Sequence, residues 1–279
     1  MNSKKEIKIL ALAVFHNRKE LTLRSLKSIF AQILPDNVTL EVVLVDDGSS
    51  DGTSETLKKE FPSVDIITGG GDLYWNQGML YGWNTIKDIG FDYLMPFNDD
   101  IILNNNAVYK LLSCIKSANI KNIVASGAMY DPIRSVTSYG GKEVINKFFP
   151  LRFKTVEPEG YCKPVDAINM NCVLIPQAVL RKNGFLSNKF KHSCGDFEYG
   201  IRHLSNGGML MLSSEHIGIC CLHDPITFKE SISLSRKLSI YRKNYPFYER
   251  LSYFRSYGGK YWALGLFVFY ISFILRIKK

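Results

Sequence analysis

The stretch LEVVLVDDGSSDGT, residues 40–53, decides the fold because it joins an apolar segment, a polar turn and the start of a helix. The run Leu40–Val45 is nearly continuous in its apolar character, which is typical of a strand covered on both faces. After it come two carboxylates, Gly48, and Ser, Asp and Thr residues that can cap a helix. The stretch therefore predicts a buried strand, a tight turn and a helix in that order.

Similar units recur through the first half of the chain. Apolar runs rich in β-branched residues occupy Ile7–Phe15, Leu40–Val45, Val64–Ile67, Tyr93–Phe97 and Ile123–Ala128. Helical spacing of apolar residues is found in Lys19–Gln32, Thr53–Phe61 and Asn106–Ser117. This alternation predicts an α/β, Rossmann-like fold with a mostly parallel central sheet flanked by helices. In such folds ligands bind beyond the carboxyl ends of the strands.

The second half has a looser pattern, with Gly140, Gly141 and prolines at 150, 158 and 164 before a strand-like stretch, Val165–Ile175. We expect a main domain over 1–226, with halves at 1–130 and 131–226. A helical extension then covers 227–279. Its last apolar run, Tyr261–Leu275, holds 15 residues without charge, fewer than the roughly 20 of a spanning helix.

Charge is concentrated at the end of the chain. The 279 residues hold 35 Lys and Arg against 26 Asp and Glu, and residues 229–279 alone hold 11 against 2, which accounts for the whole net charge of +9. With 46% hydrophobic residues, the composition excludes disordered, collagen-like and disulfide-scaffold proteins. A basic segment beside an apolar one indicates an anionic membrane surface as partner. Packing onto the main domain or a homo-oligomer interface are the alternatives.

Cysteine usage and the N-terminus indicate a cytoplasmic protein. The 6 cysteines are few and irregularly spaced, and they form neither a disulfide framework nor a CxxC zinc motif. Three lysines and the apolar run Ile9–Phe15 resemble a signal peptide, but the polar residues His16–Glu20 follow at once without a small-residue cleavage site.

Two carboxylate clusters follow predicted strands. Asp46 and Asp47 can accept hydrogen bonds from a nucleotide base or ribose. The alternative is an acidic helix cap, which would explain Asp51 or Thr53 but not Asp46 and Asp47. Asn98-Asp99-Asp100 follows the strand at 93–97, and adjacent ionised carboxylates repel unless a cation lies beside them. Hard oxygen ligands favour Mg²⁺ or Mn²⁺, whereas an ordinary acidic turn needs no ion.

Two further clusters combine polar residues with glycine and aromatic residues. The segment GGGDLYWNQGM, residues 69–79, combines three glycines that permit close backbone approach to a ligand with an aromatic pair. The segment HSCGDFEYGIR, residues 192–202, places Asp196 and Glu198 at the start of a short helix. Either could be a general base, and either could be a first-turn helix cap, which is the commoner role of such residues.

Together, FHNR (15–18), VDDGSSDGT (45–53), GGGDLYWNQGM, FNDDI (97–101) and HSCGDFEYGIR resemble glycosyltransferase family 2 over about residues 7–225. This family comprises inverting, sugar-nucleotide-dependent enzymes with the GT-A fold. The resemblance is greatest to bacterial members that build O-antigen and capsule, often rhamnosyltransferases. It implies that 1–130 bind the nucleotide sugar and that 131–226 bind the acceptor.

The resemblance assigns roles to single positions. It implies donor contacts from His16, Asn17, Arg18, Asp46 or Asp47, Asp72, Trp75 and Asp99, with Asp46 favoured as the nucleotide acceptor. It implies Mg²⁺ or Mn²⁺ bound by Asp100, and His223 is equally consistent with a metal ligand or an ordinary turn histidine. Asn98 departs from the Asp-x-Asp form of the metal motif.

On the acceptor side the resemblance makes Asp196 the general base and Glu198 a structural or acceptor-contacting residue. The implied activity is hexosyl or deoxyhexosyl transfer to a glycan or lipid-linked glycan in surface polysaccharide assembly. The protein would be peripherally associated with the inner face of the cell membrane. The alternative is a catalytically silent sugar-nucleotide-binding subunit. Nucleic-acid binding ranks last because the tail contains no recognisable module for it.

Overall fold

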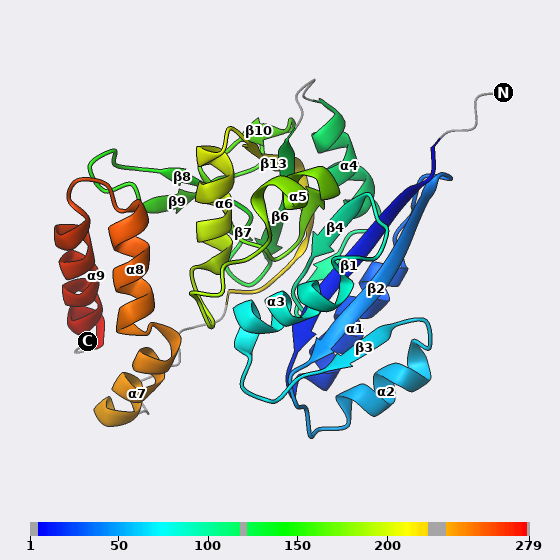
Figure 1. Cartoon of the computed structure of the whole chain (residues 1–279), viewed down its shortest axis with the longest axis horizontal. Helices are drawn as coiled ribbons and strands as arrows, with labels where there is room; N and C mark the ends of the chain where they lie inside the picture. The colour runs from blue at the N-terminus through cyan, green and yellow to red at the C-terminus, as the bar shows by residue number, and fades with distance from the viewer. Residues whose placement is uncertain (1–4, 118–121, 223–232, 278–279) are drawn as a thin grey trace. The chain divides into compact units, whose positions relative to one another are not determined.

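A computed structural model describes residues 5–117, 122–222 and 233–277 (Figure 1). The strands are β1 (Ile7–Phe15), β2 (Val38–Asp46), β3 (Asp65–Thr68), β4 (Tyr93–Pro96), β5 (Ile102–Leu103), β6 (Ile123–Asp131), β7 (Val136–Tyr139), β8 (Gly141–Val144), β9 (Phe153–Thr155), β10 (Lys163–Pro164), β11 (Ala167–Ile168), β12 (Val173–Pro176) and β13 (Met209–Ile219). The helices are α1 (Lys19–Phe30), α2 (Thr53–Glu60), α3 (Tyr74–Ile86), α4 (Ala107–Ser117), α5 (Gln177–Asn183), α6 (Gly195–Ser205), α7 (Leu234–Asn244), α8 (Phe247–Tyr257) and α9 (Trp262–Ile277).

The central sheet has the order β10-β13-β6-β12-β4-β1-β2-β3. Strands β3, β2, β1 and β4 run parallel to one another, and β13 runs parallel to β6. Between these two blocks β12 runs antiparallel to both β4 and β6. The predicted α/β fold with a mostly parallel central sheet flanked by helices is confirmed.

The two faces of β1 explain its continuous hydrophobicity. Alternate residues Ile9, Ala11, Ala13 and Phe15 belong to one core layer, which also contains apolar residues of α1 and α4. Leu10, Leu12 and Val14 belong to the opposite layer, which contains residues of α3, α5 and α6. Since successive strand residues point to opposite faces, a strand with helices on both sides is apolar at every position.

The predicted strand over Val165–Ile175 is two short strands. β11 pairs with β8 in a separate three-stranded sheet, whereas β12 lies in the central sheet. The residues between them, Asn169 to Cys172, leave regular strand geometry. This break places the Asn171 carbonyl beside the carboxyl end of β4, where it accepts the Asn98 backbone N–H.

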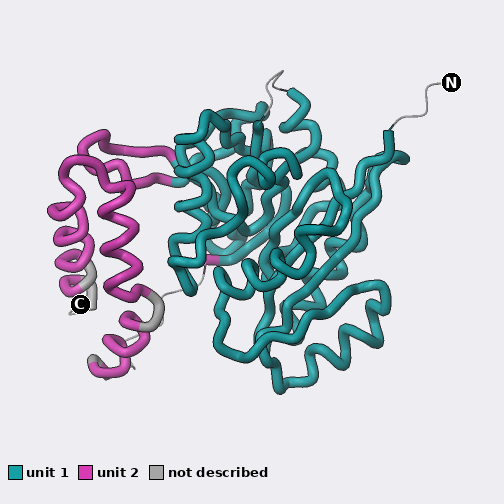
Figure 2. The backbone as a smooth tube through the Cα atoms, in the orientation of Figure 1, with its two compact units in different colours: residues 1–142, 155–221 teal, residues 143–154, 222–279 magenta. Residues whose placement is uncertain are grey.

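Contacts divide the chain into two compact units (Figure 2). One unit comprises 1–142 and 155–221, and the other comprises 143–154 and 222–279. The C-terminal part of the second unit begins at residue 222, whereas the predicted extension begins at 227, and the segment 143–154 groups with that part. The roles predicted for 1–130 and 131–226 remain predictions.

The second unit contains α7, α8 and α9, which pack through aromatic side chains. The ring of Tyr241 lies 4.9 Å from that of Tyr245 and 6.1 Å from that of Tyr270. The Arg250 guanidinium stacks over the rings of Tyr245 and Phe269 at 4.7 and 5.0 Å. Among the described residues, no helix combines the length and apolar character that crossing a membrane requires.

Candidate active site

The loops after β1 and β2 meet at the carboxyl edge of the parallel strands. Phe15 and Asp46 are paired in register, and the backbone N–H of Asp47 donates to the Phe15 carbonyl at 3.0 Å. Beyond this point Asn17 accepts a hydrogen bond from the Ser50 backbone at 2.7 Å. His16 Nδ1 lies 2.5 Å from the Asp47 carbonyl oxygen. These contacts fix the first two predicted donor-binding segments against each other.

Asp46 and Asp47 are both buried, and both carboxylates bind the protein itself. Asp46 accepts the Ser49 backbone N–H at 2.8 Å and the Ser54 hydroxyl. Asp47 accepts three backbone N–H groups of the glycine-rich segment, from residues 71, 73 and 74, at 2.8 to 3.2 Å. The Asp47 carboxylate therefore holds the glycine-rich segment in place, and nucleotide contact by Asp46 stays a prediction.

Glycine is needed at residue 48 because the turn after β2 and the glycine-rich segment approach each other closely there. A Cβ on Gly48, which has φ +70°, would lie 2.8 Å from the Cα of Gly71. A Cβ on Gly69 would lie 2.7 Å from the Leu73 side chain. Asp72 lies on this turn with an exposed side chain, 3.7 Å from Lys191. Any side chain larger than hydrogen at Gly48 would separate the two loops.

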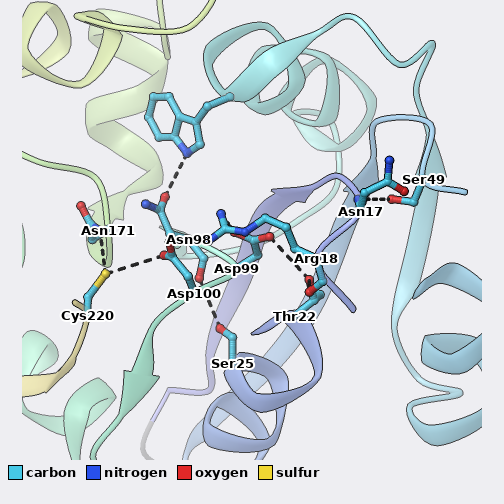
Figure 3. A network of polar contacts seen from close by, with 11 residues as sticks. Asn17, Arg18, Thr22, Ser25, Ser49, Asn98, Asp99, Asp100, Asn171 and Cys220 are labelled. Atoms are coloured by element: carbon cyan, nitrogen blue, oxygen red, sulfur yellow. Dashed lines mark hydrogen bonds and ion pairs between the residues drawn. The ribbon is translucent and has the colours of Figure 1, made fainter. Parts of the chain in front are cut away.

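The Asp99 and Asp100 carboxylates share one cation, the guanidinium of Arg18 (Figure 3). Arg18 Nη1 lies 2.8 Å from Asp99 Oδ1, and Nη2 lies 2.7 Å from Asp100 Oδ2. Burial raises the pKa of Asp99 to about 7, against the lowering effect of Arg18 and with a further rise from Asp100. The predicted donor contact Arg18 thus lies beside the predicted metal ligand Asp100.

Asn98 uses its side-chain oxygen within the protein. Trp75 Nε1 donates to Asn98 Oδ1 at 3.0 Å, and the Asn98 backbone N–H donates to the Asn171 carbonyl at 3.0 Å. Trp75, at the start of α3, therefore connects the glycine-rich segment to the acidic turn. Asn98 also joins that turn to the residues between β11 and β12.

The same residues between β11 and β12 contact the predicted base. Asn169 Nδ2 donates to Asp196 Oδ2 at 3.1 Å, and the Phe197 backbone N–H donates to Asp196 Oδ1 at 2.8 Å. Burial raises the pKa of Asp196, while these hydrogen bonds and the charge of Lys142 oppose the rise. Burial likewise lowers the pKa of Lys142, and Asp196 opposes that change.

Glu198 lies two residues further along α6, about half a turn, and is buried. Its carboxylate accepts hydrogen bonds from Arg202 Nε at 2.8 Å and from Nη2 at 3.2 Å. Arg202 also donates to the carbonyls of Asn183 and Phe185. This pair fixes α6 to the loop after α5, an arrangement suited to the predicted structural role of Glu198.

Asn76 connects α3 to the loop that precedes Asp196. Its side-chain amide donates to the carbonyls of Ser187 and Phe190 at 2.9 and 2.7 Å. A Cβ on Gly195 would lie 1.7 Å from Asn76 Oδ1, so only glycine fits there. Sequence reasoning missed Asn76, Asn169 and Lys142. Polar residues inside an otherwise apolar run, as at 169 and 171, are the signal that could have indicated Asn169.

A model of glycosyl transferase family 2 matches residues 11–170, more than half of the 279 residues. The chain belongs to glycosyl transferase family 2. The matched range contains the predicted donor residues and Asp100, and it ends before Asp196. His223, the second predicted metal ligand, lies outside the described residues.

Solved structures share the fold of this family 2 chain. A crystal structure of GalNAc-T7 with UDP, GalNAc and Mn²⁺ is 15% identical, with a TM-score of 0.62 over 90% of this chain and 50% of that chain. A crystal structure of S. aureus TarS with UDP-GlcNAc is 13% identical, with a TM-score of 0.57 over 85% of this chain and 65% of that one. This chain therefore covers about half the length of the GalNAc-T7 chain and about two thirds of the length of the TarS chain. Among curated protein sequences, none matches it.

Proposed function

We propose that this family 2 chain is an inverting glycosyltransferase that moves a sugar from a nucleoside diphosphate to an acceptor hydroxyl. The observation that carries the proposal is the connection between its two acidic segments. Asn98 of the Asp99–Asp100 turn binds the backbone of Asn171, and Asn169, two residues earlier, binds Asp196. Family membership supports sugar transfer as the reaction.

Asp196 is proposed as the general base. In an inverting transfer the acceptor oxygen attacks the anomeric carbon from the face opposite the leaving diphosphate, and its proton passes to a carboxylate. Asn169 and the Phe197 N–H hold the Asp196 carboxylate in one orientation. A fixed base beside a fixed donor contributes to the rate through positioning. Arg18 is proposed to bind the diphosphate side, where its positive charge favours an anionic ligand.

The acidic turn fits a divalent cation in its donor chemistry, because Mg²⁺ and Mn²⁺ often take one or two carboxylates together with substrate phosphates. Asp99 is buried between Arg18 and Thr22, so Asp100 would hold the ion. No group of three or more His, Cys, Asp or Glu that could hold a metal occurs within 5–117, 122–222 and 233–277. A bound cation would supply positive charge to the departing diphosphate. Arg18 Nη2 lies 2.7 Å from Asp100 Oδ2, so Arg18 and a cation would share this carboxylate.

The donor and the acceptor are further parts of the proposal. We propose UDP sugars as the first donors to test, because GalNAc-T7 was crystallised with UDP and TarS with UDP-GlcNAc. The motif resemblance supports a hexose or deoxyhexose such as rhamnose, and an acceptor of the O-antigen or capsule type carried on lipid at the inner membrane face.

The experiment is a thermal-shift screen of nucleoside diphosphate sugars with and without Mn²⁺. A shift produced by one donor and enlarged by Mn²⁺ supports the proposal. Asp100→Asn should remove the Mn²⁺-dependent part, whereas Asp36→Asn, an acidic residue in the loop between α1 and β2, should not. If no donor shifts the unfolding transition, or if the Mn²⁺ effect survives Asp100→Asn, the corresponding part of the proposal is wrong.

A further inference from the structure

Helix α9 is apolar on two faces. Its inner face packs within the second unit: Leu266 is buried, the Phe269 ring contacts those of Phe254 and Tyr245, and Tyr270 contacts Tyr241. Its outer face consists of exposed apolar residues, here named the α9 stripe: Leu264, Phe267, Val268, Ile271, Ile274 and Leu275.

The α9 stripe is continuous along the helix. Counted from Leu264, its members follow at +3, +4, +7, +10 and +11, which places them on one side of an α-helix. A helix that is apolar all round is normally buried, and large exposed apolar patches mark interaction sites. The α9 stripe therefore needs a partner that covers apolar surface.

The charge around α9 selects the kind of partner. Lys260, two residues before the start of α9, and Arg255 on α8 are exposed. Residues 229–279 hold 11 Lys and Arg against 2 Asp and Glu, a net charge of +9. A second copy would bring an equal positive charge to the same surface, and like charges oppose association. An anionic bilayer supplies both the apolar phase and the opposite charge.

Aromatic residues lie at the N-terminal end of the stripe. Tyr261 and Phe148 are exposed, and their ring centroids are 6.1 Å apart. Tyrosine is enriched at the boundary between lipid headgroups and water, because one end of its ring is apolar and the other polar. Exposed Lys147 and Lys260 adjoin these aromatic residues in sequence.

We propose that the α9 stripe inserts into the headgroup region of an anionic bilayer, with α9 lying along the membrane surface. The 16 residues of α9 extend over about 24 Å, less than the roughly 30 Å of a hydrocarbon core. Membrane binding of α9 is separate from sugar transfer, and it can be measured without any transfer reaction. A failure here leaves the proposed reaction untouched.

The test is sedimentation of the full chain with vesicles of phosphatidylcholine, alone or with about 30% phosphatidylglycerol. Wild type should bind the anionic vesicles and lose affinity in about 0.5 M salt. Ile271→Glu with Leu275→Glu should weaken binding roughly tenfold or more, because two charges replace apolar side chains in the stripe. The control, Ile89→Glu with Ile133→Glu, changes two exposed isoleucines of the first unit and should bind like wild type.

A second variant, Phe267→Ala with Ile274→Ala, removes apolar surface without adding charge and should weaken binding several-fold. Circular dichroism establishes that each variant is folded. The proposal is overturned if wild type ignores anionic vesicles, or if both folded stripe variants bind as wild type does. It is also overturned if the stripe variants instead dissociate a dimer that does not bind vesicles.

Discussion

The side-chain amide of Asn169 donates from Nδ2 to Oδ2 of Asp196, with 3.1 Å between the two atoms. The contact joins the segment after β11 to the first turn of α6, and it restricts the orientation of a partly buried carboxylate. Burial raises the pKa of Asp196, whereas Asn169, Phe197 and Lys142 favour its ionised form. The availability of the proposed base at neutral pH therefore depends on these neighbours.

Lys142→Met should move the acid limb of the pH–rate profile to higher pH. The positive charge of Lys142 lowers the pKa of Asp196, so its removal leaves Asp196 protonated over a wider range. A general base works only when deprotonated, and activity is lost as pH falls through its pKa. Lys5→Met, which removes an exposed lysine paired with Asp92, serves as the control. An unchanged acid limb in Lys142→Met would exclude the electrostatic role.

Asp196→Asn should stabilise the fold. Because the folded-state pKa lies above the unfolded value, the native state binds more protons between the two pKa values. The free energy of unfolding therefore falls as pH rises through that window. Asparagine does not ionise, so at neutral pH the variant should have a higher Tm than wild type.

Thermal unfolding of wild type and Asp196→Asn at about pH 4 and about pH 8 measures this effect. The Tm difference between the two proteins should be larger at the higher pH. A Tm difference that is constant or reversed with pH would contradict the assignment of a partly buried, ionised Asp196.

Gly195→Ala should destabilise the protein by about 1–3 kcal/mol, because the added methyl group would lie 1.7 Å from Asn76 Oδ1. Gly90→Ala is the matched control, since no atom lies within 4 Å of its added Cβ. Urea unfolding provides the comparison. If Gly195→Ala and Gly90→Ala are equally stable, Asn76 does not constrain the start of α6.

Trp75→Phe should weaken donor binding by roughly five- to tenfold, about 1 kcal/mol, because it removes the N–H that binds Asn98 Oδ1. Asn98→Asp keeps an acceptor oxygen at that position and should bind the donor more tightly than Trp75→Phe does. Titration calorimetry with the donor found by the screen measures both. Wild-type affinity in Trp75→Phe would show that this contact does not shape the donor site.

Much of the central sheet could be predicted from the sequence, because strands such as β1 are apolar on both faces. α3 was missed. Glycine lowers helix propensity, yet Gly78 and Gly82 lie within this helix. A Cβ on Gly78 would lie 2.8 Å from Val14, and one on Gly82 would lie 2.7 Å from Val45, so glycine permits α3 to pack on the sheet. That constraint arises from tertiary contact and leaves no local pattern.

The sequence indicates Asp46 and Asp100 as candidate ligands because carboxylates follow strands at both positions, and their binding roles stay predictions. The partners of these groups were not predictable. Lys142 lies 54 residues before Asp196 in the sequence. Only the fold brings the two charges together. Asn169 and Asn171 interrupt an apolar run, but that local pattern does not show that Asn169 reaches Asp196, which only the fold brings near it.

The most direct test compares sugar transfer and donor affinity in Asp196→Asn. The account predicts a loss of transfer of about 10²- to 10⁴-fold, with the donor dissociation constant within about twofold of wild type, because the carboxylate acts on the acceptor. Transfer at a rate near that of wild type, by a variant that binds the donor normally, would contradict it.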